Sequence, residues 1–259
     1  MTLLAQVKTE AEDVPANEMR PVRINIQGTD GIGKSTFGAG APSPIFIQAE
    51  DGLNFIKDVP RFPKADQWND IIAQITTLAT EDHTFRTLVL DTTDAACLLA
   101  EARVCEKNNW ESIETPGYGK GFTAVRECWV KLIEGLSWLH TQKNMNIILL
   151  SHVHIRPFND PSHDSYDRWE MRCQKNVNAL IKDWVDFNLF ANYETNMVKE
   201  GSKKTRGVSY GNRFLFTKFA AAHDAKSRVN LPARIDFSWD SFAQHYTAAL
   251  AAPSTKTNK

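Results

Sequence analysis

Short apolar runs, rich in β-branched residues, alternate along this chain with stretches in which apolar residues recur every three or four positions. Four runs predict buried strands: VRINIQ, IFIQAE, TLVLD and NIILLSHV, at residues 22–27, 45–50, 87–91 and 146–153. Because these runs are apolar at nearly every position, they are typical of strands in a parallel sheet that is covered on both faces.

Two segments between these runs have the periodicity of amphipathic helices. Their apolar positions are Trp68, Ile71, Ile72, Ile75 and Leu78 in one, and Val125, Trp129, Leu132, Ile133, Leu136 and Leu139 in the other. Strands that alternate with helices in this way predict an α/β fold with a mostly parallel central sheet flanked by helices.

The pattern changes beyond about residue 177. There DFNLFANYE and GNRFLFTKF flank the polar stretch KEGSKKTRG, which predicts an antiparallel C-terminal hairpin that extends the sheet. Polar, irregular ends predict a flexible N-terminal segment at residues 1–20 and a disordered tail at 252–259, with one domain at 21–251 between them.

Length and composition narrow the classes of function. A chain of 259 residues, with 42% hydrophobic positions, suits one domain with a full core. Its formal charge of −1 means that a nucleic-acid partner would have to meet a local basic patch. No apolar run reaches the roughly 18 residues that span a bilayer, so we expect neither membrane insertion nor secretion. The chain is expected in the cytoplasm, that of a bacterial host if it is phage-encoded.

The cysteines support this expectation. They lie far apart and without CxxC spacing, which predicts neither a zinc site nor a disulfide framework. We interpret them as reduced thiols; they are Cys97, Cys105, Cys128 and Cys173.

A glycine-rich segment follows the first predicted strand directly. VRINIQ runs into GTDGIGKST, which matches GxxxxGK[ST] in the strand-then-loop context of a phosphate-binding loop. In such a loop, backbone N–H groups and a helix N-terminus surround phosphate, a lysine reaches the terminal phosphates and a serine ligates Mg²⁺. We predict that ATP binds here, with Lys34 also catalytic and Ser35 a Mg²⁺ ligand; the alternative is a chance match in a glycine-rich turn. The predicted nucleotide-binding residues are Gly28, Thr29, Asp30, Gly31, Ile32, Gly33, Lys34, Ser35 and Thr36.

A carboxylate ends the strand TLVLD. Four apolar residues carry Asp91 to the carboxyl end of this strand, and ligands bind at that edge in open α/β sheets. Asp91 is therefore predicted as a second residue of the Mg²⁺ site, in reach of the hydration shell of the ion. The alternative is an ordinary aspartate in the turn after a strand.

The order of these features resembles the RecA family. In that family the next core strand ends in a glutamate that activates the attacking water, and IFIQAED places Glu50 there. The resemblance implies that Glu50 is the general base, with Asp51 as the substitute. The alternative for Glu50 is a surface acid at the start of a turn.

Two further segments resemble RecA-like proteins. NIILLSHVH is similar to the strand that ends in a sensor of the γ-phosphate, which implies this role for His152. A core histidine, or a metal pair with His154, are the alternatives. AKSRVNLP is similar to the lysine-x-arginine finger of hexameric helicases and recombinases, which implies that Lys226 and Arg228 reach the γ-phosphate of a neighbouring subunit. Solvated surface charges are the alternative here.

Over about residues 20–240 the chain is most similar to phage ATP-binding proteins of the RecA-like single-strand annealing, or Sak, type. The shared pattern is GxGKST, a strand ending in DxE or AE, hhhD, a YG loop, a strand ending in SH, and AKxR. The chain lacks the flanking domains of bacterial RecA and has His152 where RecA has glutamine. The resemblance implies a homo-oligomer, ring or filament, that acts on single-stranded DNA in recombination, with a single-strand DNA-binding protein as a further partner.

Two segments occupy the places of the DNA-binding loops of RecA relatives. They are NNWESIETPGYGKG, at residues 108–121, and IRPFNDPSHDSYDRWEMRCQK, at residues 155–175. Aromatic rings interleaved with cations suit stacked bases on a phosphate track, although four acidic residues in the second segment oppose it. A lid or a partner-binding loop is the alternative. The predicted DNA contacts are Trp110, Tyr118, Lys120, Arg156, Arg168 and Arg172.

Three hypotheses of function remain open. The first is an Mg²⁺-dependent, DNA-stimulated ATPase that anneals single strands. The second is a RecA-like helicase or DNA motor. The third is a nucleotide-gated module that binds a protein partner and hydrolyses ATP slowly.

Overall fold

The computed structural model describes residues 19–252, apart from 163, 195, 201–203 and 209–210. The predicted N-terminal segment and tail therefore lie almost wholly outside the described residues. The elements are β1 (Arg23–Gly28), α1 (Lys34–Ala39), β2 (Pro44–Gln48), α2 (Trp68–Thr80), β3 (Thr87–Asp91), α3 (Thr93–Asn108), α4 (Lys120–Gln142), β4 (Asn146–Phe158), β5 (Tyr166–Met171), α5 (Lys175–Trp184), β6 (Phe187–Tyr193), β7 (Asn196–Glu200), β8 (Lys204–Val208), β9 (Arg213–Phe216), β10 (Lys226–Ser227), β11 (Arg234–Asp236) and α6 (Trp239–Ala251).

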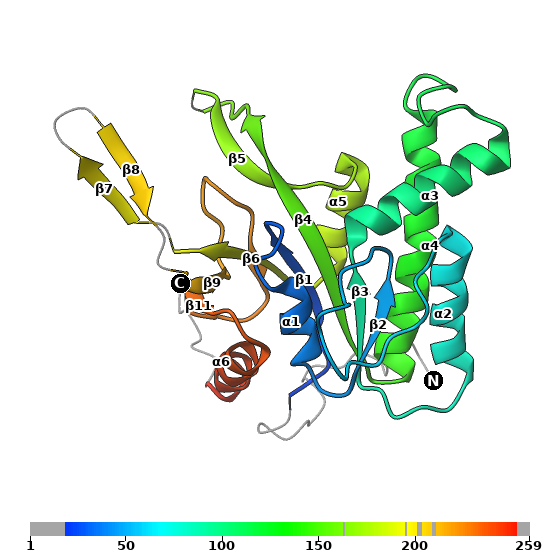
Figure 1. Cartoon of the computed structure of the whole chain (residues 1–259), viewed down its shortest axis with the longest axis horizontal. Coiled ribbons are helices and arrows are strands. Elements are labelled where there is room, and N and C mark those ends of the chain that lie inside the picture. Colours follow the sequence, from blue (N-terminus) through cyan, green and yellow to red (C-terminus); the bar gives the residue numbers. More distant parts are fainter. Residues whose placement is uncertain (1–18, 163, 195, 201–203, 209–210, 253–259) are drawn as a thin grey trace, which may run out of the picture.

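A mostly parallel sheet forms the centre of the fold (Figure 1). Its path runs β11-β9-β6-β1-β4-β3-β2, and the five strands from β6 to β2 are parallel to one another. The predicted fold class is confirmed, and each of the four predicted strands is present. Since β4 lies between β1 and β3, the carboxyl ends of β1 and β3 flank β4 at one edge of the sheet, where Gly28 lies opposite His152 and Asp91 opposite Leu150.

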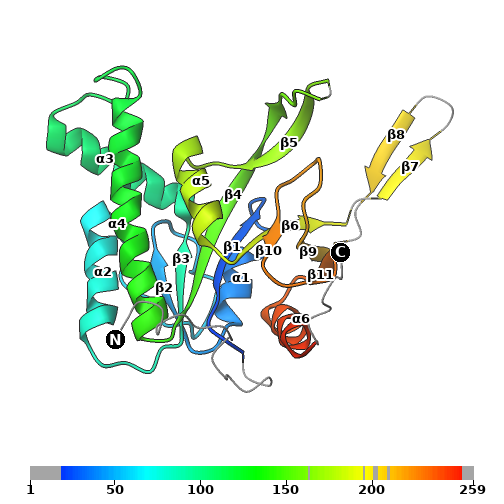
Figure 2. The same cartoon turned by 180° about the vertical axis from the view of Figure 1, so that it is seen from behind.

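Two apolar cores cover the two faces of the sheet, because residues that follow one another along a strand point to opposite faces. In β3, Leu88 and Leu90 pack in one core and Val89 in the other. The first core contains residues of α2, α3, α4 and α5, and the second contains residues of α1 and α6. Figure 2, which views the molecule from behind, shows α2, α3, α4 and α5. The two predicted helices are confirmed as α2 and α4.

The predicted C-terminal hairpin is confirmed and is more elaborate than the pattern indicated. Strands β6 and β9 pair antiparallel, so the two apolar runs do extend the sheet. Between them, β7 and β8 form a separate two-stranded sheet. Strands β10 and β11 add further antiparallel pairs, with β6 and β9.

The segment at residues 155–175 corrects one expectation. It was expected as a loop, but β4 continues to Phe158 and pairs antiparallel with β5, so that His154 lies opposite Glu170. Both this hairpin and the β7–β8 sheet project from the same side of the molecule as the carboxyl ends of the strands (Figure 1). All four cysteines are free thiols. In the described part of the chain, no helix combines the length and apolarity that crossing a membrane requires.

Candidate nucleotide site

The glycine-rich loop joins β1 to α1 and depends on glycine for its shape. Gly31 and Gly33 have φ values of 71° and 106°, which residues with a Cβ rarely adopt. A Cβ on Gly28 would lie 2.7 Å from the carbonyl oxygen of Ala191 on β6. The strand before the loop can therefore lie against β6 only if this position lacks a side chain.

Lys34, the first residue of α1, turns back over the loop. Its Nζ atom donates to the carbonyl oxygens of Gly28, at 3.1 Å, and Thr29, at 2.9 Å. The side chain is buried, and burial lowers its pKa although several acidic groups nearby favour the charged form. Among the described residues, Lys34 forms no ion pair within 4.0 Å. A buried ammonium without a counter-ion is costly, so an anion that entered this loop would be stabilised.

Ser35 and Asp91 meet beside the lysine. The Ser35 hydroxyl donates to Oδ2 of Asp91 at 2.6 Å, which joins the glycine-rich loop to the end of β3. Burial raises the pKa of Asp91, although Ser35 and Lys34 oppose this shift. Two hard oxygen donors in contact are suitable ligands for Mg²⁺.

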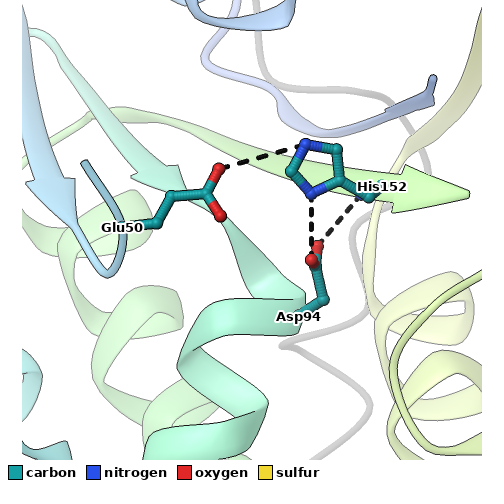
Figure 3. A group of neighbouring side chains, drawn as sticks. All are labelled: Glu50, Asp94 and His152. Carbon is teal, nitrogen blue, oxygen red and sulfur yellow. Dashed lines mark hydrogen bonds and ion pairs between the residues drawn. The ribbon is translucent and has the colours of Figure 1, made fainter. Parts of the chain in front are cut away.

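Glu50, Asp94 and His152 form a cluster at the carboxyl edge (Figure 3). Nδ1 of His152 lies 2.9 Å from Oδ2 of Asp94, and the His152 backbone N–H donates to Oδ1 of the same carboxylate at 3.0 Å. Nε2 of His152 is 3.9 Å from Glu50 Oε1. Asp94 therefore fixes both the position and the ring orientation of His152.

Local sequence explains why Asp94 is at this place. The side chain of Thr92 caps α3 by accepting from the Ala95 N–H, so Asp94 falls in the first turn of the helix, where a carboxylate is favourable. Burial tends to raise the pKa of Asp94, but the hydrogen bonds from His152 hold it below its usual range. Each member of the cluster offers one ligand atom within 4.8 Å of the others, which would also suit a metal ion. Since Nδ1 of His152 is already engaged by Asp94, the hydrogen-bonded arrangement explains the same geometry.

Asp30 of the glycine-rich loop reaches the same histidine. Its Oδ1 atom lies 3.1 Å from Nε2 of His152, and its Oδ2 atom accepts from Nη2 of Arg172 at 2.9 Å. Burial is the largest single influence and favours the neutral acid, but the hydrogen bond from Arg172 and the charges of His152, Arg172 and Lys34 together hold the pKa of Asp30 below its usual range. The loop, β4 and the end of the β4–β5 hairpin are thus joined through one carboxylate.

Sequence elements that are far apart line one cavity of about 280 Å³ at this edge. The loop contributes Lys34 and Ser35. Glu50 follows β2, Asp91 ends β3, and His152 lies within β4 where the neighbouring strands end. The structure therefore brings together the predicted loop, Mg²⁺ ligands, base and sensor. Asp51 is next to Glu50 but is exposed, with its carboxylate 3.5 Å from Nζ of Lys64.

Lys226 and Arg228 do not lie at this cavity. Nζ of Lys226 donates to the carbonyl oxygen of Lys182 at 2.5 Å, and Nε of Arg228 lies 3.0 Å from Oδ1 of Asp186. Since β10 pairs with the first residues of β6, both side chains lie toward the amino end of the parallel strands, away from the glycine-rich loop. Their predicted action was on a neighbouring subunit, and a single chain leaves it a prediction.

The six residues predicted to contact DNA are in different surroundings. Tyr118, Lys120 and Arg156 are exposed, and Trp110 is partly buried against the core of α2 to α5. Arg168 is buried, with its guanidinium 5.0 Å from the ring of Phe158, so it offers little surface to a phosphate.

Both predicted DNA segments nevertheless contribute to one cavity of about 650 Å³. Gly119 comes from the first segment, and Arg156, Arg172 and Lys175 come from the second. Asp94 also lines this cavity, which therefore adjoins the cluster around His152.

Two residues of the site were not predicted from the sequence. Asp94 had a local signal, namely a threonine cap followed by an acid in the first turn. Arg213 had none: its guanidinium donates to the carbonyl oxygen of Ile32 at 2.9 Å and would lie 2.5 Å from a Cβ on Gly33, 180 positions earlier in the chain.

Comparison with known proteins gives a family match over most of the chain. A family model described as AAA domain matches residues 20–229. No curated protein matches the chain. Solved structures that are similar include one described as the crystal structure of the RadB recombinase. It is 12% identical, with a TM-score of 0.45, over 86% of this chain and 90% of that chain.

Proposed function

Because this chain belongs to the AAA domain family and is thus a P-loop NTPase of the RecA/AAA class, we propose that it hydrolyses ATP and acts on single-stranded DNA. One observation carries the nucleotide part of the proposal. The ammonium of Lys34 is buried in the glycine-rich loop and forms no ion pair among the described residues. A triphosphate would supply the missing negative charge, and the loop amides and the start of α1 would surround it.

In this proposal, each side chain around the cavity has a separate role in hydrolysis. Ser35 and Asp91 would hold Mg²⁺, which neutralises phosphate charge when bound. Glu50 accepts a proton from the attacking water, and its raised pKa, caused by burial and by the neighbouring carboxylates, makes it a better base than an exposed glutamate. His152, oriented by Asp94, donates a hydrogen bond to the terminal phosphate.

The DNA part of the proposal is supported by the cavity of about 650 Å³ that both predicted segments line. Arg156 and Lys175 line this cavity together with the carboxylates of Asp94 and Glu101. The exposed ring of Tyr118 lies in the loop just before Gly119. Cations attract phosphates and an exposed ring can stack on a base. We propose annealing of single strands by a homo-oligomer, in which Lys226 and Arg228 serve a neighbouring subunit.

ATP turnover measured with and without single-stranded DNA tests this proposal. We expect DNA to raise the rate, and the stimulation to fall as salt is increased, because phosphate contacts release counter-ions. The matched variant is Arg156→Ala, which should weaken the stimulation and leave the rate without DNA unchanged. Turnover that is indifferent to DNA at every salt concentration would refute the DNA part and leave the nucleotide part standing.

A further inference from the structure

The carboxylate of Asp30 contacts two residues from other elements: His152, which lines the nucleotide cavity, and Arg172, which lies next to His152 in the fold. Its two carboxylate oxygens lie 3.1 Å from Nε2 of His152 and 2.9 Å from Nη2 of Arg172. We propose that Arg172 is a selectivity residue that exchanges this carboxylate for the γ-phosphate of ATP, so that the site prefers a nucleoside triphosphate to a diphosphate. The inference rests on the proposed ATP site and assigns Arg172 to the nucleotide, although its sequence position suggested a DNA contact and it also lines the cavity of about 650 Å³.

The position of Arg172 is fixed by the backbone. Its N–H donates to the carbonyl oxygen of His152 at 3.0 Å, immediately after β5 ends. Arg172 is thus held beside the residue that we propose as the sensor of the terminal phosphate. The Arg172 side chain is 40% exposed, so a change of rotamer can move it away from Asp30.

The pair with Asp30 is weak enough to be replaced. The Asp30 side chain is 65% exposed, and exposed ion pairs contribute little to stability because water and salt screen them. A terminal phosphate carries more charge than a carboxylate and offers three oxygens, and the planar guanidinium binds two oxygens of such a group at once. Exchange of the carboxylate for phosphate is therefore favourable.

The preference for ATP over ADP follows from the γ-phosphate, which only ATP carries. The α- and β-phosphates are common to ATP and ADP, and Lys34 with the loop amides would bind them in either nucleotide. Only ATP has a phosphate that can compete with Asp30 for His152 and Arg172. When ADP is bound, Arg172 stays paired with Asp30 and contributes nothing to nucleotide binding.

The test compares the dissociation constants of ADP and of a non-hydrolysable imido analogue of ATP, measured by calorimetry with Mg²⁺. In Arg172→Ala we expect the analogue to bind about tenfold or more weakly and ADP to bind as before, because only a terminal phosphate loses a charged hydrogen bond. Arg172→Lys should keep part of the preference. Arg126→Ala, which removes an exposed arginine on α4, is the matched control and should keep both constants.

A double-mutant cycle with Asp30→Asn isolates the exchange. Removing the competing carboxylate should increase the triphosphate preference of the otherwise unchanged protein, and this increase should vanish when Arg172 is alanine. If Arg172→Ala weakens both nucleotides equally, or neither, the inference about Arg172 is wrong. If the unchanged protein binds neither nucleotide, the ATP site is wrong and the inference falls with it.

Discussion

Replacing Lys34 with alanine is expected to abolish ATP turnover and nearly all nucleotide binding while the fold stays intact. Lys34 supplies the buried positive charge of the glycine-rich loop, with its Nζ atom bonded only to carbonyl oxygens among the described residues. Loss of one fixed donor to a developing anion costs on the order of 10²- to 10³-fold in rate, and loss of a full charge costs at least as much. Turnover by phosphate release and binding by calorimetry measure the two effects.

The stability of the Lys34→Ala variant distinguishes loss of binding from loss of fold. Burial lowers the pKa of Lys34, so below its folded-state pKa the charged side chain opposes folding, and this penalty fades as pH rises through that value. At neutral pH the variant should therefore unfold at the same temperature as the unchanged protein, or at a higher one. Lys64→Ala, on an exposed lysine near Asp51, is the matched control for both assays. Turnover that survives in Lys34→Ala contradicts the whole catalytic assignment.

Replacing Glu50 with glutamine should reduce turnover by about 10²- to 10⁴-fold, the usual contribution of a general base, without loss of ATP binding. Glutamine keeps the size of the side chain and removes the proton acceptor. Glu50 lines the cavity just after β2, and the amide of glutamine fills the same space, so the cavity keeps its shape for the nucleotide. Single-turnover kinetics, together with the dissociation constant of ATP, separate the two quantities. A nucleotide-gated module with slow hydrolysis would instead change little.

The adjacent Asp51→Asn substitution makes the same chemical change one residue later. Asp51 is exposed and pairs with Lys64, so we expect its variant to keep full turnover. Were Asp51→Asn to lose the activity and Glu50→Gln to keep it, the base would be Asp51.

The pH dependence of turnover tests independently whether Glu50 is the general base. Burial raises the pKa of Glu50, with further contributions from Asp91 and Asp94 against the opposing effect of His152. Since the base works only when it is ionised, turnover should fall on acidification at a pH above the usual range of a glutamate. In Glu50→Gln, the remaining turnover should lack this acid limb.

Strands and the glycine-rich loop were predictable because both are encoded locally. The apolar run TLVLD forms a strand that is buried along its whole length. Asp91 ends this strand and so lies at the edge of the sheet where Ser35 also lies. Once the strands are parallel, the carboxyl ends of β1, β2 and β3 must meet beside the middle of β4, which brings Lys34, Glu50 and His152 to the same edge of the sheet.

Other features depend on contacts that no local pattern encodes. Helix α3 was not predicted because its buried face consists mainly of small residues such as Ala96, Cys97 and Ala100. Such residues give only a weak helical periodicity of apolar positions. Strand β4 continues past Val153 through HIRPF, whose polar residues and proline are typical of a loop, because β5 supplies the pairing partner. The meeting of Asp30 with Arg172 joins positions 142 residues apart, so only the folded chain reveals it.

Strand β4 has a mechanical consequence for the molecule. One unbroken run of backbone, Asn146–Phe158, passes from the middle of the parallel sheet, beside β1 and β3, out to the tip of the projecting hairpin. At about 3.3 Å per residue, the six steps beyond His152 make an arm of roughly 20 Å. This arm is paired with β5 from Val153 to Phe158. A tilt of a few degrees at His152 would therefore displace Phe158 by about an ångström. A small displacement of His152 would therefore become a larger displacement at Phe158.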